Sequence, residues 1–306
     1  MLNGLAGQTA VLTGAGSGFG LECMRIAAKA GMQLVLVDIQ DDALTRAAEE
    51  ALRLGAKYVM ARRIDVSNSE AMDALGQEVK NLLGAPHFVF NNAGVGGSGG
   101  LLWEQSVRDW EWVLGVNLWG VIHGVRVFTP MMLEAARQDP AWQGHIVNTA
   151  SMAGLLTPPN MGVYNVSKHA VVSLTETLYQ DLRLVTDQLH CSVLCPYFVP
   201  TGIANSERNR PYEVDDASLT ASQKIARTMT QKAVNSGKVS AKDIASKVFS
   251  AIADNQFYIF SHPQALGSVQ ARMEDILQLE NPRDAFADKP LVGEQLRAAL
   301  RGASAV

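Results

Sequence analysis

Short apolar runs alternate with amphipathic segments along most of this chain. Seven runs have the length of a β-strand without polar alternation, which is typical of strands buried on both faces of a sheet. They cover residues 8–13, 33–38, 58–64, 87–90, 145–149, 191–195 and 257–260. Helical patterns lie between or after them, at about 21–30, 41–54, 69–83, 106–137, 164–187, 222–234, 241–253 and 262–279. The alternation predicts an α/β fold with a doubly wound parallel sheet of about seven strands and helices on both faces.

Two local signals refine the expected helices. Pro130 lies inside the long pattern 106–137 and predicts a break or kink there, because proline cannot donate a backbone hydrogen bond. Ser67 or Ser69 is expected to cap the helix that ends at Leu83, since a serine hydroxyl can accept a hydrogen bond from the first turn.

The 306 residues are expected to form one large domain with a lid and an appended tail. Residues 1–262 carry the strand and helix alternation. Within them, residues 197–235 are predicted to form a lid, because a long irregular stretch inside a compact domain is usually a binding loop. Residues 263–306 are predicted to be a C-terminal helical extension.

Small and polar residues follow the ends of the predicted strands. Because parallel strands end at the same edge of a sheet, these residues are expected to gather there, where doubly wound sheets bind ligands. The set is Gly14, Asp38, Asp65, Asn91, Ser151 and Pro196.

The composition excludes some function classes. The formal net charge is -4 and no basic run is present, so a nucleic-acid partner is not expected and the substrate is expected to be small. Cys23, Cys191 and Cys195 are odd in number and read as reduced core thiols, and no histidine pair has the spacing of a metal site. We expect no metal.

The start of the chain, Met1–Leu5, lacks a charged segment followed by a long apolar one. No stretch approaches twenty uninterrupted apolar residues either, so no membrane association is expected. These observations favour a cytoplasmic location.

A glycine-rich turn joins the first strand to the first helix in the sequence Gly14-Ala15-Gly16-Ser17-Gly18-Phe19-Gly20. Strand, glycine turn and helix together point backbone N–H groups and a helix N-terminus at a phosphate. An ordinary strand-to-helix turn is the alternative interpretation of the same residues.

Tyr164 and Lys168 stand four residues apart, on one face of a predicted helix. An ammonium near a phenol favours the ionised phenolate, and a free phenol has a pKa of roughly 10. The pair therefore has the chemistry of an acid/base device, although a tyrosine and a lysine at helical spacing are common. Ser151 precedes the tyrosine by thirteen residues.

Taken together, these motifs resemble the short-chain dehydrogenase/reductase family over roughly residues 5–260. The glycine spacing is G-x-x-x-G-x-G, and the other matching residues are Thr13, Asn91-Asn92-Ala93-Gly94, Asn117, Ser151 and Tyr164-x-x-x-Lys168. The resemblance implies a Rossmann fold and an oxidoreductase that transfers a hydride between a nicotinamide and a secondary alcohol or ketone. The loop after Pro196 and the tail also loosely resemble the branch that oxidises benzylic alcohols of aryl ethers, the aryl-ether Cα-dehydrogenases.

The resemblance implies that NAD is the cofactor. Asp38 would accept hydrogen bonds from the adenosine ribose and repel the 2′-phosphate of NADP, which is therefore less expected. A helix N-cap role is the alternative for Asp38. Ser17 and Ile39 stand where relatives that prefer NADP often carry a basic residue. The full set of expected cofactor contacts is Gly14, Ser17, Gly18, Phe19, Gly20, Asp38, Asp65, Val66, Asn92, Ala93, Gly94, Tyr164, Lys168, Pro196, Val199 and Thr201.

The resemblance also implies the catalytic roles. Tyr164 would exchange the proton of the substrate oxygen, Ser151 would hold that oxygen, and Lys168 would lower the pKa of Tyr164 and bind the nicotinamide ribose. Asn117 matches the fourth residue of the family's catalytic set, whose backbone helps to hold a water that connects the lysine to solvent. An asparagine at a helix bend is the alternative interpretation of Asn117. Tyr197 departs from the pattern, because relatives usually have glycine after the proline, which puts the local backbone geometry in doubt.

Two other function classes stay open from the sequence. One is an NAD-dependent epimerase or dehydratase of related fold, although the glycine spacing differs and no large C-terminal substrate domain is evident. The other is a dinucleotide-binding sensor without activity. Relatives form homodimers or homotetramers. Tyr197, Phe198 and Tyr212 border the expected cleft, so a bulky apolar or aromatic substrate is plausible.

Overall fold

The computed structural model describes residues 4–303. The remaining terminal residues, 1–3 and 304–306, lie outside the described part, and the targeting expectation placed on Met1–Leu5 falls largely on them. No helix in the described part of the chain is long and apolar enough to cross a membrane.

Seven strands of the described residues form one sheet in the order β3-β2-β1-β4-β5-β6-β7. Every neighbouring pair is parallel. The strands are β1 (Thr9–Thr13), β2 (Gln33–Asp38), β3 (Tyr58–Arg63), β4 (Phe88–Asn91), β5 (Gly144–Thr149), β6 (Leu189–Cys195) and β7 (Tyr258–Phe260). The strand order reverses between β1 and β4, which makes the sheet doubly wound and confirms the predicted fold class.

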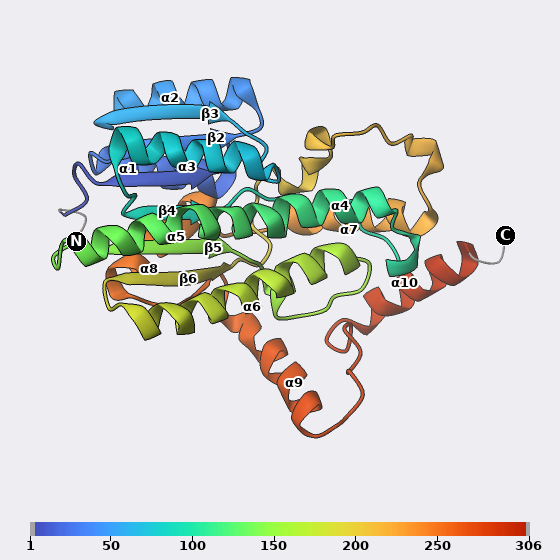
Figure 1. Ribbon diagram of the computed structural model, residues 1–306. Helices are drawn as coiled ribbons and strands as arrows, with labels where there is room; N and C mark the ends of the chain where they lie inside the picture. Colours follow the sequence, from blue (N-terminus) through green and yellow to red (C-terminus); the bar gives the residue numbers. More distant parts are fainter. Residues whose placement is uncertain (1–3, 304–306) are drawn as a thin grey trace.

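Helices cover both faces of the sheet (Figure 1). One layer holds α1 (Gly18–Lys29), α2 (Asp41–Leu54) and α8 (Ala241–Asp254), and the other holds α3 (Ser69–Leu83), α5 (Gly120–Gln138) and α6 (Gly162–Val185). Alternate residues of a strand enter different cores: Leu12 packs with the first layer, while Val11 packs with the second. Continuous apolar strands thus reflect burial on both sides.

The long helical region is interrupted, but not at Pro130. It consists of α4 (Val107–Leu114), a π-helical turn (Gly115–Trp119) and α5, which runs through Pro130 without a break. Pro130 and Arg126, whose carbonyl loses its helical donor, lie on the exposed face of α5. Water can therefore satisfy that carbonyl, and the predicted break is wrong.

The cap of α3 also differs from the expectation. The N-cap residue is Asn68, whose side chain accepts a hydrogen bond from the Ala71 amide at 3.0 Å. The neighbouring Ser67 instead donates its hydroxyl to Asp65 at 2.7 Å. Three adjacent polar residues could each have capped this helix, and the path of the chain after Asp65 selects the middle one.

The region after β6 contains more regular structure than its polar composition suggests. It holds 3₁₀ helices at Gly202–Asn209 and Asp216–Ser218, followed by α7 (Ala221–Asn235). Shorter 3₁₀ turns occur elsewhere at Leu102–Glu104, Met152–Gly154 and Pro263–Ala265.

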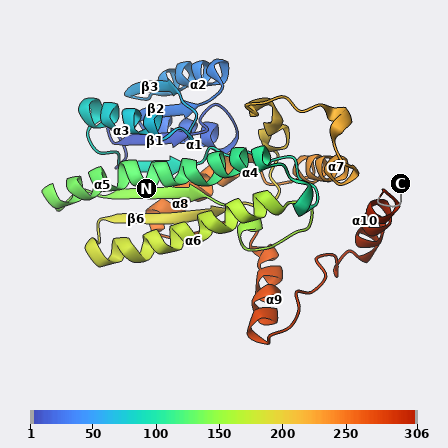
Figure 2. The same cartoon turned by 45° about the vertical axis from the view of Figure 1, so that its right-hand side comes forward.

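Two helices form the C-terminal part of the described chain. In Figures 1 and 2, α9 (Leu266–Leu277) points away from the sheet, and α10 (Pro290–Ala303) returns toward α7, against which it packs. The segment between them, together with α9, reaches the rim of the cavity described below.

Candidate active site

The glycine turn has the geometry of a phosphate cradle. Gly14 and Gly18 have positive φ angles, +66° and +54°, which glycine adopts without strain. A Cβ atom on Gly20 would lie 2.1 Å from the carbonyl oxygen of Gly14, so only glycine lets α1 approach the turn this closely. The N-cap residue, Ser17, makes no side-chain capping bond. The first N–H groups of α1 are therefore available to an anion.

Asp38 ends β2 beside this turn. One carboxylate oxygen accepts a hydrogen bond from the Gly16 amide at 2.8 Å, and the other accepts one from the Gln40 amide at 2.9 Å. The N-cap residue of α2 is Gln40, so the alternative N-cap role of Asp38 is wrong. The carboxylate also lines the cavity, where its remaining acceptor positions face the space beside the turn.

Thr13 and Asn92 brace the floor of the site. The Thr13 hydroxyl accepts hydrogen bonds from the amides of Asn92 at 2.8 Å and Ala93 at 3.0 Å, and the Asn92 side chain donates to the Thr13 carbonyl at 3.0 Å. The ends of β1 and β4 are thereby fixed where the strand order reverses. Asn91, in contrast, points into the core and donates to Asn148 at 2.8 Å.

Asn117 is completely buried in the π-helical turn. Its side chain accepts a hydrogen bond from the Val95 amide at 2.8 Å and donates to the Val95 carbonyl at 2.9 Å and to Ser167 at 3.1 Å. Asn117 thus joins the loop after β4 to α6. Its side chain does not line the cavity, because these three partners enclose it.

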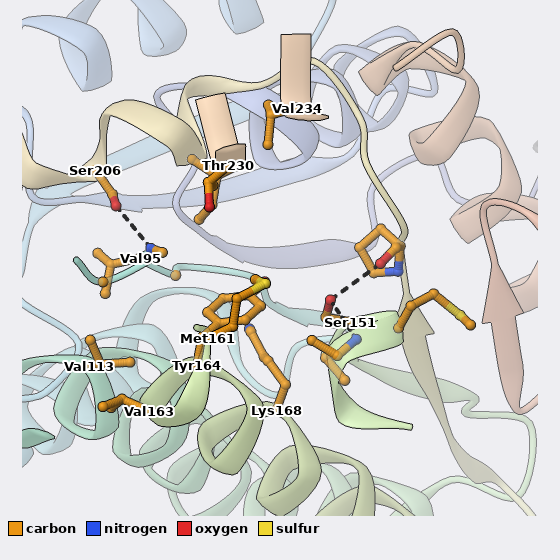
Figure 3. Close-up of a pocket in the computed structure, with 18 of the residues that line it drawn as sticks. Val95, Val113, Ser151, Met161, Val163, Tyr164, Lys168, Ser206, Thr230 and Val234 are labelled. Carbon is orange, nitrogen blue, oxygen red and sulfur yellow. Dashed lines mark hydrogen bonds between the residues drawn. The ribbon is translucent and has the colours of Figure 1, made fainter. Parts of the chain in front are cut away.

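Tyr164, Lys168 and Ser151 lie together at the base of the cavity (Figure 3). Tyr164 and Lys168 come from the first turns of α6, and Ser151 follows β5. The Ser151 hydroxyl accepts from the Ala153 amide at 3.1 Å and donates to the Pro196 carbonyl at 3.3 Å. The Lys168 ammonium donates to the Thr149 carbonyl at 2.8 Å and lies 5.7 Å from the centre of the Tyr164 ring.

Burial governs the titration of this group. It raises the pKa of the Tyr164 phenol, although the Ser151 hydroxyl acts in the opposite direction. It also lowers the pKa of Lys168 to about 8, because the ammonium has left water without gaining a carboxylate partner. At neutral pH Lys168 is therefore still mostly a cation, and its charge is felt at short range in a buried site.

All of these features open into one cavity of about 710 Å³. Of the expected catalytic and cofactor-binding residues, Gly20 and Asn117 do not line this cavity, since both pack behind it. Asn91, expected at the same edge, does not line it either, because it points into the core. The end of the cavity above Tyr164 has apolar walls that the sequence did not single out. These walls include Val95, Val113, Met161, Val163 and Val234, with the Thr230 hydroxyl group among them (Figure 3).

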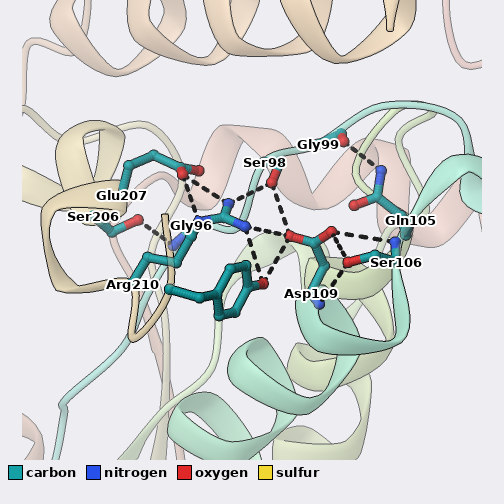
Figure 4. Close-up of polar contacts among 10 residues, drawn as sticks. Gly96, Ser98, Gly99, Gln105, Ser106, Asp109, Ser206, Glu207 and Arg210 are labelled. Carbon is teal, nitrogen blue, oxygen red and sulfur yellow. Dashed lines mark hydrogen bonds and ion pairs between the residues drawn. The ribbon is translucent and has the colours of Figure 1, made fainter. Parts of the chain in front are cut away.

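A buried ion pair ties the lid segment to the rest of the site (Figure 4). Arg210 contacts the Asp109 carboxylate at 2.6 Å, Ser98 at 2.5 Å and the Tyr212 hydroxyl at 3.0 Å, and its guanidinium lies 4.7 Å from the Trp112 ring centre. The side chains of Arg210 and Asp109 are 4% and 9% exposed. Sequence reasoning missed this pair because the two residues are 101 positions apart.

Tyr197 fits its position without backbone strain. Among the described residues, the non-glycine positions with positive φ are Asn160, Asn255 and Leu279, and Tyr197 is not one of them. Its amide donates to the Ser261 hydroxyl at 2.8 Å, and its ring contacts those of Phe198 and His262. Pro196 and Thr201 both line the cavity, so a tyrosine in place of the family glycine does not remove them from it.

Histidines take no part in this site. Within the described residues no group of three or more potential ligands could hold a metal ion. His145 is a buried residue of β5, and its Nε2 atom lies 2.7 Å from the hydroxyl of Ser192 on β6. His123 lies on α5 beside the Trp119 ring.

The doubly wound sheet, the glycine cradle, the strand-end carboxylate and the Ser151, Tyr164 and Lys168 group define a class: a dinucleotide-dependent oxidoreductase. The comparisons agree. The sequence model described as short chain dehydrogenase matches residues 8–211, and the chain belongs to this family.

Relatives extend the match over most of the chain. A solved short chain dehydrogenase/reductase from Burkholderia phymatum, in complex with NAD, is 52% identical with a TM-score of 0.87 and covers 92% of this chain and 98% of its own. The 1-deoxy-11-beta-hydroxypentalenate dehydrogenase of Streptomyces exfoliatus is 33% identical over 88% of each chain. The C alpha-dehydrogenase of Sphingobium sp. strain SYK-6 is 27% identical over 91% of this chain and 88% of its own.

These findings confirm the expected family, fold and enzyme class, and include a relative from the Cα-dehydrogenase branch. The chain belongs to the short-chain dehydrogenase/reductase family, and the two curated relatives are named as dehydrogenases. These findings favour a dehydrogenase over the epimerase or dehydratase and over the inactive sensor. In agreement, the described residues after β7 form the helices α9 and α10 rather than a large substrate domain.

Proposed function

We propose that the chain uses NAD to interconvert a secondary alcohol and its ketone, with Tyr164 as the general acid/base. One observation carries the proposal: Tyr164, Ser151 and Lys168 share a cavity with the glycine cradle and with Asp38. In one cavity, Asp38 would bind the adenosine, the glycine turn would bind the pyrophosphate, and Tyr164 would lie beside the nicotinamide.

The catalytic residues divide the work of oxidation. The Ser151 hydroxyl holds the substrate oxygen, and the Tyr164 phenolate removes the proton from that oxygen. A nicotinamide held beside Tyr164 and Lys168 would supply the acceptor for the hydride of the adjacent carbon. Lys168 stabilises the phenolate, and its contact with Thr149 keeps the ammonium close to the ring. In the reductive direction Tyr164 returns the proton.

Asp38 supports a preference for NAD over NADP. Its carboxylate is fixed by the amides of Gly16 and Gln40, so it cannot turn away from a ribose beside it. A 2′-phosphate would meet this negative charge at short range, whereas two ribose hydroxyls would find an acceptor. The Burkholderia phymatum relative was solved in complex with NAD, which agrees.

The cavity favours a bulky substrate with an apolar body. Aliphatic side chains line its upper part, and the apolar surface of an alcohol bound there would be removed from water against these side chains. Phe198 extends this lining with an aromatic ring. The Streptomyces exfoliatus relative is named for a hydroxylated substrate, 1-deoxy-11-beta-hydroxypentalenate, which agrees with a secondary alcohol.

We also propose that the chain works as a homodimer or homotetramer in the cytoplasm. Trp119, the residue before α5, and Val166, on α6, are about half exposed, and an interface would form along these two long helices. Their burial would remove apolar surface from water. The three cysteines of the sequence are buried free thiols, which supports a reducing compartment.

The test is a panel of secondary alcohols, from small aliphatic to bulky aryl compounds, assayed with NAD⁺ and NADP⁺ in parallel. We expect NAD⁺ reduction with at least one bulky alcohol and at least tenfold lower efficiency with NADP⁺. The Ser151→Ala variant provides the control for background reduction. Binding of NAD⁺ without turnover across the panel would instead support the sensor and contradict the proposal.

A further inference from the structure

The lid segment crosses the cofactor part of the cavity rather than only the substrate part. At one end, the Thr201 side chain lies beside the glycine turn: a Cβ atom on Gly18 would be 3.5 Å from it. At the other end, the Asn209 side chain accepts a hydrogen bond from Gln40, two residues after Asp38. The 3₁₀ helix between these contacts therefore spans from the pyrophosphate cradle to the adenosine side.

Arg208 lies within this span and lines the same cavity. Its Nη2 atom would be 3.2 Å from a Cβ atom on Gly202, the residue that follows Thr201. The guanidinium group is therefore close to the segment that faces Gly18 and the N-terminus of α1.

The guanidinium group is anchored at one nitrogen and free at the others. Nη1 donates to the carbonyls of Gly202 at 3.0 Å and Asn205 at 2.6 Å, which occupies both of its protons. Within residues 4–303, Nη2 and Nε have no hydrogen-bond partner. A planar guanidinium group with free N–H donors on Nη2 and Nε can bind two oxygen atoms of a phosphate.

The local charge also favours an anion. The first turn of α1 has no acidic side chain, and its N–H groups carry the positive end of the helix dipole. A dinucleotide pyrophosphate brings two negative charges to this point. Lys168 belongs to the catalytic group and already donates to Thr149.

We propose that Arg208 binds the pyrophosphate of the dinucleotide, so that the lid closes over the cofactor by a charged contact. The inference rests on the proposed NAD-dependent function and deepens it, because the glycine cradle would hold one side of the pyrophosphate and the lid the other. Cofactor release then requires the lid to open.

The test measures the affinity of the full-length protein for ligands with and without the pyrophosphate. Dissociation constants are determined by calorimetry for NAD⁺ and ADP-ribose, and by competition with NADH for adenosine. The variants are Arg208→Gln, Arg208→Lys and the control Arg46→Gln, which removes the same charge from an exposed position on α2 outside the cavity. No turnover is involved.

For Arg208→Gln we expect about tenfold weaker binding of NAD⁺ and ADP-ribose, with adenosine unchanged within twofold. Arg208→Lys should fall between, because an ammonium keeps the charge but loses the fork. Arg46→Gln should match the wild type.

Two other results would overturn the inference. Unchanged NAD⁺ affinity in Arg208→Gln would mean that Arg208 does not contact the pyrophosphate. Equal losses for adenosine and NAD⁺ would mean that Arg208 acts only by shaping the lid. A wild-type protein that binds no NAD⁺ would be distinct from both of these, since it would overturn the proposed function as well.

Discussion

Lys168 and Tyr164 show how burial and charge compete in one site. The sequence motif predicts that the lysine lowers the pKa of the phenol, yet in the described structure burial raises it. Lys168 itself has a pKa lowered to about 8 for the same reason. A lower phenol pKa therefore depends on additional positive charge in the loaded site, which an oxidised nicotinamide supplies when bound.

Asp38 allows a direct test of cofactor choice. The Asp38→Asn variant keeps an acceptor oxygen for the Gly16 amide but removes the negative charge. We expect the KM for NAD⁺ to rise about tenfold, and the ratio of NADP⁺ to NAD⁺ efficiency to rise by more, because the repulsion is lost as well. Steady-state kinetics with both cofactors provide the measurement.

The matched control is Asp41→Asn, the same change three residues further on, outside the cavity lining. It should leave both cofactor constants unchanged. An Asp38→Asn variant with the wild-type cofactor ratio would mean that the carboxylate only supports the turn.

Residues of the site were predictable where the chemistry requires a fixed local spacing. The glycine turn and the Tyr164–Lys168 pair follow from the geometry of one turn and one helix. Arg210 was not predictable, because Asp109 and Ser98 are far away in the sequence. Arg208 was not predictable either, because any arginine in a polar loop has the same local pattern. Thr230 gives no signal either, since only the tertiary fold brings this face of α7 to the cavity.

The segment predicted to be a lid is held to the start of α4 by the buried Arg210–Asp109 pair. Burial alone would raise the pKa of the Asp109 carboxyl, but hydrogen bonds from Ser106 and Arg210 outweigh it and hold the pKa below its usual range. Asp109 also belongs to the capping box of α4 together with Ser106. One carboxylate thus links the start of α4, the glycine-rich loop at Ser98 and the lid.

A double-mutant cycle tests this link. Arg210→Gln leaves the Asp109 charge buried without its partner and should lower the free energy of unfolding by about 3 kcal/mol. Adding Asp109→Asn removes that charge, so the double variant should be more stable than the sum of the two single effects implies. Urea unfolding of the four proteins gives the coupling. Additive effects would mean that the pair does not hold the lid.

At the level of elements, apolar periodicity predicted the strands and helices but not their junctions. The π-helical turn at Asn117 looks like ordinary helix in sequence, because its cause is the set of hydrogen bonds to Val95 and Ser167. Pro130 predicted a break that does not form. The Arg126 carbonyl, which loses its hydrogen-bond donor, lies on the exposed face of α5, where water can bind it. The expected cap of α3 was Ser67 or Ser69, and this prediction was wrong, because the path of the chain places Asn68 at the N-cap.

In the whole molecule, the cavity and the histidine that governs stability in acid, His145, lie at opposite edges of the sheet. The residues proposed to bind the cofactor and to transfer the proton line one cavity at the carboxyl ends of the strands. His145 lies at the start of β5, near the other edge, and burial lowers its pKa to about 3. The unfolded chain binds a proton near pH 6.5, so between these values it holds more protons than the folded protein.

Stability should therefore fall as the solution is acidified. The contribution of His145 is fully present above pH 6.5 and is lost as the pH falls toward about 3. Its slope is at most about 1.4 kcal/mol per pH unit. His145→Gln keeps a partner for Ser192 and should give a shallower decline between pH 6 and pH 4, measured by urea unfolding. The histidine control is His262→Gln, and an unchanged slope in His145→Gln would contradict the assignment.

The central claim is that Tyr164 transfers the proton, and one variant tests it most directly. Tyr164→Phe removes the phenolic oxygen and leaves the ring, so we expect an unchanged dissociation constant for NAD⁺. The kcat/KM for the best alcohol of the panel should fall by about 10²- to 10⁴-fold. Near-normal turnover by a Tyr164→Phe protein that binds NAD⁺ normally would contradict the account.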